Sequence, residues 1–100
     1  MAAGRQTAEV VVPCPLTRAE LPALFERTCE LLARERCELL VCEVGGVAAD
    51  AVAVDALALL ALAARRRGCE VRLRSPSREL LALVELIGLA RVLRVLEAGA

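Results

Sequence analysis

Cysteine is the residue type in this chain that most readily suggests covalent chemistry. Five cysteines stand at positions 14, 29, 37, 42 and 69, and histidine is absent. A thiol nucleophile needs a nearby base or cation to hold it as thiolate, so we do not expect catalysis from these residues. Their odd number and the lack of CxxC or CxxxH spacing argue against a disulfide framework and a metal site. We interpret them as small apolar side chains and predict neither a metal nor another cofactor.

The stretch GGVAADAVA, residues 45–53, is the second place where chemistry could reside. It follows the apolar run CELLVCEV and precedes a helical pattern, as a phosphate-binding turn often does, but GxxxxGK[ST] and GxGxxG motifs are both missing. Asp50 stands where a helix N-cap would, and its carboxylate can accept backbone N–H groups of the first helical turn. This role is compatible with direct contact to a partner. Without a histidine base or a framed pair of carboxylates, we predict a protein that is not an enzyme.

Composition limits the kinds of partner. Of the 100 residues 58% are apolar and one is aromatic, so recognition by stacking is not expected. Thirteen basic residues, all arginine, balance thirteen acidic ones, so no net field attracts nucleic acid or an anionic membrane. The longest apolar-rich stretch, 51–64, contains Asp55 and is shorter than the ~20 residues that span a bilayer, and the first six residues lack the apolar segment of a signal peptide. We predict a cytoplasmic protein without membrane insertion.

Strand and helix patterns alternate along the chain. Its length suits one domain, which we place at residues 8–97 after a frayed terminus at 1–7. The expected strands are 8–12 at a sheet edge, 37–44 at the sheet centre, 69–74, and a weak strand or short helix in 90–96. Helices are expected from about residue 21, from 50 or 51 to 67, and after Ser75 and Pro76 as N-cap and first residue. This order predicts an α/β fold: a single-layer mixed, largely parallel sheet of about four strands with three to four helices.

The second of these helices has two apolar sides. Helical geometry places five residues on a stripe expected to pack against the sheet: Ala53, Leu57, Leu60, Ala61 and Ala64. The opposite side carries Val52, Asp55, Leu59, Leu62 and Arg66. If the sheet covers the first stripe, the apolar members of the second point outward, and such patches often mark interfaces. The alternative is that a neighbouring segment of the chain covers them.

From Leu39 to Leu96 the chain resembles a STAS domain, the module of anti-sigma factor antagonists and of cytoplasmic parts of sulfate transporters. The resemblance rests on a hydrophobic strand ending in GGV before Asp50, on DALALLALAARRRGCEVRLRSPS, and on ELLALVELIGLARVL. The chain is also similar to the shorter MlaB-like branch, whose members are accessory subunits of lipid-transport ABC complexes. Both resemblances imply the fold predicted above and a function in binding other proteins.

The resemblance also assigns a position to the usual regulatory phosphate. Phosphorylatable antagonists carry Asp-Ser-Ser-Gly or Asp-Thr-Ser-Gly at the strand-to-helix turn, and a kinase modifies the second hydroxyl residue. Aligned on Asp50, this chain has Val52 at the acceptor position, where no oxygen can receive phosphate. The resemblance therefore implies a regulator that is not switched by phosphorylation at the usual site.

Two classes of partner follow from the resemblance. The first is an anti-sigma factor or serine kinase-like ATPase, bound through the Asp50 turn and the helix after it. The alternative is the ATPase of an ABC transporter, bound through the same helix, and a homodimer through Leu59 and Leu62 can accompany either. The predicted partner-binding residues are Asp50, Ala51, Val52, Asp55, Leu59, Leu62 and Arg66.

Overall fold

The computed structural model describes residues 6–34 and 36–96, in which four strands form one sheet in the order β1-β2-β3-β4. Every neighbouring pair is parallel, which confirms the predicted α/β class and the largely parallel sheet. The strands are β1 (Thr7–Val11), β2 (Leu39–Glu43), β3 (Glu70–Arg74) and β4 (Leu93–Val95). The helices are α1 (Leu21–Arg34), α2 (Ala51–Arg66) and α3 (Arg78–Leu86), with a short 3-10 helix η1 (Arg18–Glu20) before α1.

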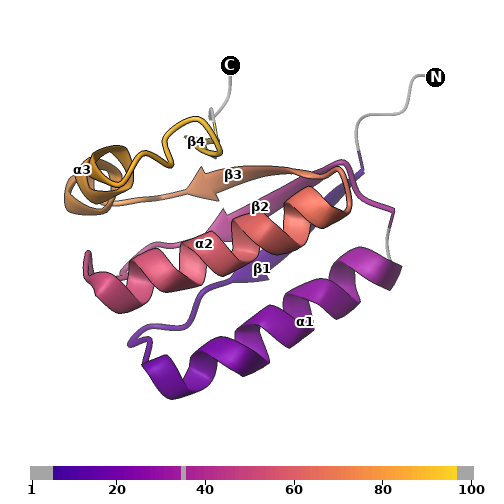
Figure 1. The fold of residues 1–100 in the computed structure, drawn as a ribbon, viewed down its shortest axis with the longest axis horizontal. Helices are drawn as coiled ribbons and strands as arrows, with labels where there is room; N and C mark the ends of the chain where they lie inside the picture. The colour runs from indigo at the N-terminus through magenta and orange to yellow at the C-terminus, as the bar shows by residue number, and fades with distance from the viewer. Residues whose placement is uncertain (1–5, 35, 97–100) are drawn as a thin grey trace.

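The helices cover the sheet unequally. Figure 1 shows α1 and α2 side by side across one face of the sheet, while α3 lies beyond the carboxyl end of β3. Because side chains alternate along a strand, every second strand residue points toward the two helices. The buried strand residues of this core are Ala8, Val10, Leu40, Cys42, Val71, Leu73 and Leu93. The core thus lies between the sheet and the α1–α2 pair.

The other face of the sheet carries a row of charged side chains around one valine. Glu9, Val41, Arg72 and Arg94 occupy equivalent positions on the four strands. Val41 is only 2% exposed although it lies outside the main core cluster. We attribute this to the aliphatic stems of its long neighbours, because arginine and glutamate can cover apolar surface while their charged ends stay in water. The prediction that the strand at 37–44 is buried on both faces is confirmed for β2.

Helix α1 begins where the sequence predicted. Thr17 and Glu20 form the predicted capping box, in which the Thr17 backbone N–H donates to the Glu20 carboxylate at 2.9 Å. The regular helix then begins at Leu21, as the position of Pro22 indicated. Its buried face consists of Leu21, Leu24, Thr28 and Leu32, and Thr28 satisfies its hydroxyl by donating to the Leu24 carbonyl at 2.8 Å.

In the carboxyl-terminal third, the structure corrects the predicted cap of α3 and resolves the ambiguous segment 90–96. Ser75 does not cap α3, which is a correction: its φ of 62° places it in the left-handed turn that leads out of β3. Ser77 is the cap instead, and its side chain accepts from the Leu80 N–H at 3.0 Å. The ambiguous segment 90–96 contains a strand, and the Leu96 N–H bonds to the Leu73 carbonyl at 2.8 Å.

The ends of the predicted domain fall close to the limits of the described residues. Strand β1 begins at Thr7, one residue earlier than expected. The first five residues of the expected frayed terminus and residue 97 of the expected domain lie outside the described residues.

Candidate functional site

The turn after β2 is held by the first residue before α2. Asp50 has an extended backbone, and its Oδ1 atom accepts a hydrogen bond from the Ala53 N–H at 2.9 Å. The predicted N-cap is therefore present, and it satisfies one of the N–H groups that a helix leaves unpaired at its start. Asp50 and Ala51 are both exposed. Both side chains are therefore accessible to a partner in the part of the chain that the structure describes.

The path of the chain between β2 and Asp50 depends on a glycine and a cysteine. Gly46 has a φ of 84°, which favours glycine, and a Cβ there would lie 3.4 Å from the Cys14 sulfur. The Cys14 Sγ donates to the Gly46 carbonyl at 2.8 Å. The loop after β1 thus supports the loop after β2, as expected where the carboxyl ends of parallel strands meet at one edge of a sheet.

Val52 lies one residue into α2, at the position that the family resemblance assigns to the phosphate acceptor. It is half-buried and packs against the hydrophobic core. The side chain therefore contributes to the junction between α2 and the core, and it offers no hydroxyl at this point of the turn.

The outward side of α2 is less apolar than the sequence predicted. The predicted sheet-facing stripe is buried throughout, from Ala53 to Ala64. However, Val52 and Leu59 do not point freely into solvent, because both pack partly against the core, and Ala56 and Ala63 beside them are buried. Helix α1 lies along this side of α2 and explains the burial. Of the three predicted outward residues only Leu62 is exposed, at 43%, and Arg66 is exposed near it.

Asp55 has a partner within the chain. Its carboxylate forms an ion pair with Arg18 of η1, and both side chains are about half exposed. An exposed pair of this kind contributes at most about 1 kcal/mol, since both charges are well hydrated when they separate. The contact instead orients Asp55 toward the α1 side of α2, next to the Asp50 turn.

A small apolar hollow lies next to the same turn, between the start of α2 and the end of α3. Its volume is about 340 Å³, and it is lined by residues of α2, of its N-terminal turn and of α3: Ala49, Asp50, Ala51, Val54, Asp55, Leu83 and Ile87. Leu86 and Ile87 at the end of α3 are 81% and 40% exposed. The α3 residues were missed by the sequence reasoning. The available signal was that ELLALVELI carries more apolar positions than one buried helical face can accept.

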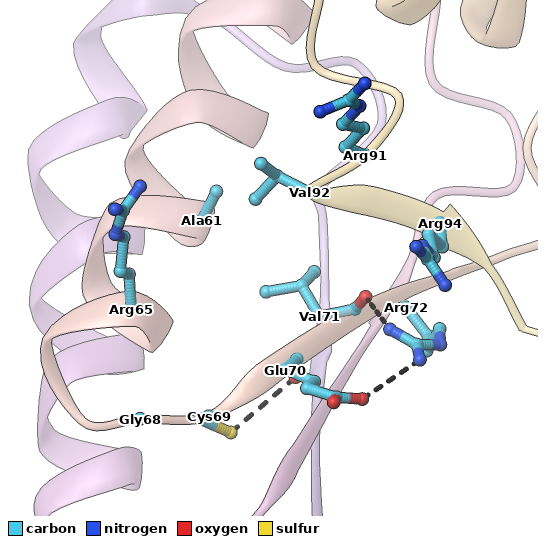
Figure 2. Close-up of a pocket in the computed structure, with 10 residues that line it drawn as sticks. All are labelled: Ala61, Arg65, Gly68, Cys69, Glu70, Val71, Arg72, Arg91, Val92 and Arg94. Atoms are coloured by element: carbon cyan, nitrogen blue, oxygen red, sulfur yellow. Dashed lines mark hydrogen bonds and ion pairs between the residues drawn. The ribbon is translucent and has the colours of Figure 1, made fainter.

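A second, basic pocket lies at the opposite end of α2. Figure 2 shows Arg65, Arg91 and Arg94 around an apolar floor of Ala61, Val71 and Val92. Its volume is about 410 Å³. Arg72 also lines it, but its guanidinium is engaged by Glu70 at 2.9 Å. Guanidinium groups that surround such a floor can bind carboxylate or phosphate groups.

Metal binding and membrane crossing are two further functions that side chains and helices can provide. Among residues 6–34 and 36–96, no group of three or more histidine, cysteine, aspartate or glutamate side chains could hold a metal ion. Over the same residues, no helix combines the length and the apolar character required to cross a membrane.

Comparison with known proteins gives a match in structure and none in sequence. No family model matches the chain, and no curated protein sequence matches it. A solved structure described as the anti-sigma factor antagonist SpoIIAA in its unphosphorylated form superposes with a TM-score of 0.70. The match covers 98% of this chain and 86% of that chain, at 13% sequence identity. The predicted STAS-like fold is therefore confirmed, and the chain shares the fold of an anti-sigma factor antagonist.

Proposed function

We propose that this protein is a non-catalytic STAS-type regulator that acts by occupying the surface of a protein partner, in the manner of an anti-sigma factor antagonist. One observation carries the proposal. The start of α2, at Asp50 and Ala51, is exposed, carries no hydroxyl and lies beside an apolar hollow. The fold around it matches that of an anti-sigma factor antagonist over 98% of this chain. The partner would be an anti-sigma factor or a serine kinase-like ATPase, and the protein would work in the cytoplasm.

The proposed binding surface extends from the amino-terminal turn of α2 along the outer side of the helix. It combines Asp50 and Ala51, the exposed Leu62 on the outer side of the helix, and Leu86 and Ile87 at the end of α3. Exposed leucine and isoleucine side chains supply apolar area, while Asp50, Asp55 and Arg66 supply polar contacts at its edge. Val52 and Leu59 support this surface from beneath because both pack against the core.

Binding by this surface would not be controlled by a phosphate on Val52. A phosphate ester of the serine or threonine type requires a hydroxyl, and the turn residues Ala51, Val52 and Ala53 have none. We therefore propose that association is constitutive at this turn and governed by the concentrations of the two proteins.

Affinity purification of the intact chain from its native cells tests the proposal. We expect a soluble protein with a serine kinase-like ATPase domain or an anti-sigma factor among the bound proteins. Leu62→Arg and Ile87→Arg should each reduce its recovery at least tenfold, because each places a charge in the apolar part of the surface. Ala33→Arg is the matched control, since it adds the same side chain at an exposed position of α1. Equal recovery with all three variants would contradict the proposed surface.

The same experiment addresses the alternative function. Recovery of the ATPase of an ABC-type lipid transporter, in place of an anti-sigma factor, would assign the protein to the MlaB-like class. Analytical ultracentrifugation of the purified chain tests the homodimer, which Leu62→Arg should weaken if α2 forms the dimer contact.

A further inference from the structure

Two cysteines far apart in the sequence meet at the amino-terminal edge of the sheet. Cys37 precedes β2 and Cys69 directly precedes β3, and their Sγ atoms lie 3.1 Å apart. The sheet produces this proximity, because β2 and β3 are parallel neighbours with Leu39 opposite Glu70. The Glu70 N–H also bonds to the Glu38 carbonyl at 2.9 Å, which holds the two strand starts together.

We propose that Cys37 and Cys69 form a reversible disulfide, and that the oxidant is a low-molecular-weight disulfide carrying carboxylate groups. A disulfide bond is about 2.05 Å long, so closing the present gap requires a movement of about one ångström, which side-chain rotation can supply. Neither cysteine belongs to the partner surface proposed above, which begins at Asp50, at the other end of α2.

The exchange would proceed in two steps that balance. Cys37, which is half-buried, attacks the external disulfide as thiolate, forms a mixed disulfide and releases one thiolate of the oxidant. Cys69, only 7% exposed, then attacks the Cys37 sulfur as thiolate and releases the second. The two protons lost by the cysteines pass through solvent to the two released thiolates. One external disulfide is reduced to two thiols while the two protein thiols become one disulfide.

The surroundings favour an anionic oxidant. Cys69 lines the basic pocket with Arg65, Arg91 and Arg94, as Figure 2 shows, while Arg72 binds Glu70 beside it. Although the chain has no net charge, the described residues that line this pocket include four arginines and one acid, Glu70. Such a local excess raises the concentration of small anions near Cys69, and therefore near the Cys37 sulfur 3.1 Å away, and this effect weakens as salt is added.

The other three cysteines are placed differently. Cys42 is fully buried in β2, and burial raises the pKa of its thiol to about 12, so it stays protonated and unreactive. Cys14 lies at the carboxyl edge of the sheet, where it bonds to Gly46. Cys29 is half-buried on α1. Cys14 is exposed, but the sulfur-to-sulfur contact that the proposal rests on joins Cys37 and Cys69.

Oxidation of the purified chain with oxidised glutathione tests the proposal. Titration should find five thiols before oxidation and three after it, with no disulfide between chains. Trypsin cleaves after arginine, so the bridge should join peptide 37–65 to peptide 68–72. Because the bridge closes a loop that contains β2 and α2, the melting temperature should rise by on the order of 10 °C and return on reduction.

Variants identify the pair and the order of the steps. Cys69→Ser should retain glutathione on Cys37, Cys37→Ser should react slowly, and neither should gain thermal stability on oxidation. Cys29→Ser is the matched control and should still form the bridge. Because peptide 37–65 also contains Cys42, Cys42→Ala should give the same linked peptides as the native chain. Five remaining thiols after oxidation, or a bridge that involves another cysteine, would overturn the proposal.

Charge dependence tests the nature of the oxidant. Arg65→Gln and Arg91→Gln should each slow the reaction with oxidised glutathione several-fold at low salt. Neither variant should change the rate of the reaction with neutral hydroxyethyl disulfide. Equal rates for both variants and the native chain with oxidised glutathione would refute the anionic preference.

Discussion

The Asp50 carboxylate accepts the Ala53 backbone N–H at 2.9 Å, so the residue that aligns with the family's acidic position also caps α2. Asp50→Ala should therefore lower the free energy of unfolding by about 1 kcal/mol, whereas Asp50→Asn should retain most of it, because asparagine caps helices nearly as well. Urea denaturation at neutral pH measures both values. If the partner recognises the charge itself, Asp50→Asn will lose affinity while it keeps its stability. An equal loss of stability in both variants would show that the carboxylate does more than cap the helix.

Three leucines of α2 should respond differently to substitution. Leu62→Arg should change the free energy of unfolding by no more than about 0.5 kcal/mol, because Leu62 is substantially exposed. Leu57→Ala should cost about 2–5 kcal/mol, since Leu57 is buried in the core. Leu59→Arg should fall between them, because Leu59 packs partly against the core. Thermal unfolding monitored by circular dichroism ranks the variants. A loss for Leu62→Arg as large as that for Leu57→Ala would place Leu62 within the packed interior.

The hydroxyl of Thr28 should be dispensable. It is fully buried and donates to the Leu24 carbonyl at 2.8 Å, but that carbonyl stands four residues earlier in the helix and can accept the Thr28 N–H. Thr28→Val removes the hydroxyl and keeps the shape, so neither partner loses its last hydrogen bond. We expect a change within about 1 kcal/mol in either direction by urea denaturation. A loss above about 2 kcal/mol would show that the hydroxyl has another essential contact.

Cys42 should make the protein less stable at alkaline pH. Burial raises its pKa from 9.0 to about 12, so between these values the unfolded chain releases a proton that the folded chain keeps. Stability is therefore unaffected by this group below its unfolded pKa, and it falls above that pKa by at most about 1.4 kcal/mol per pH unit. Urea midpoints under reducing conditions, between about pH 8 and pH 11, measure the slope.

Substitution separates this effect from other alkaline titrations. Cys42→Ala should flatten the slope because the titrating thiol is gone. An identical slope in the native chain and in Cys42→Ala would contradict the assignment.

The elements that the sequence predicted well are those governed by local chemistry. The capping box at Thr17 and Glu20, the cap at Asp50 and the helix end before Gly68 each depend on residues within a few positions of one another. The periodic burial of α2 from Ala53 to Ala64 follows from helical geometry once one face meets a sheet. The cap of α3 was misplaced because two serines flank Pro76, and the choice depends on how the chain leaves β3.

The candidate site also has features that the sequence predicted and features that depend on packing. The Asp50 turn and the absence of a hydroxyl at Val52 could be read directly from the residues. The covering of Val52 and Leu59 could not, because it depends on how α1 packs along α2. The contribution of Leu83 and Ile87 could not either, because it depends on where α3 lies relative to the start of α2.

The sequence by itself determined the α/β order, the start of α1, the limits of α2 and a turn without a hydroxyl at residues 51–53, because propensity, capping and periodicity act over a few residues. Only the tertiary structure decided which apolar side chains remain outside and which thiols meet. Cys37 and Cys69 stand 32 positions apart, and a parallel strand pairing brings their sulfurs to 3.1 Å. Such contacts depend on strand order and register, which no short stretch of residues encodes alone.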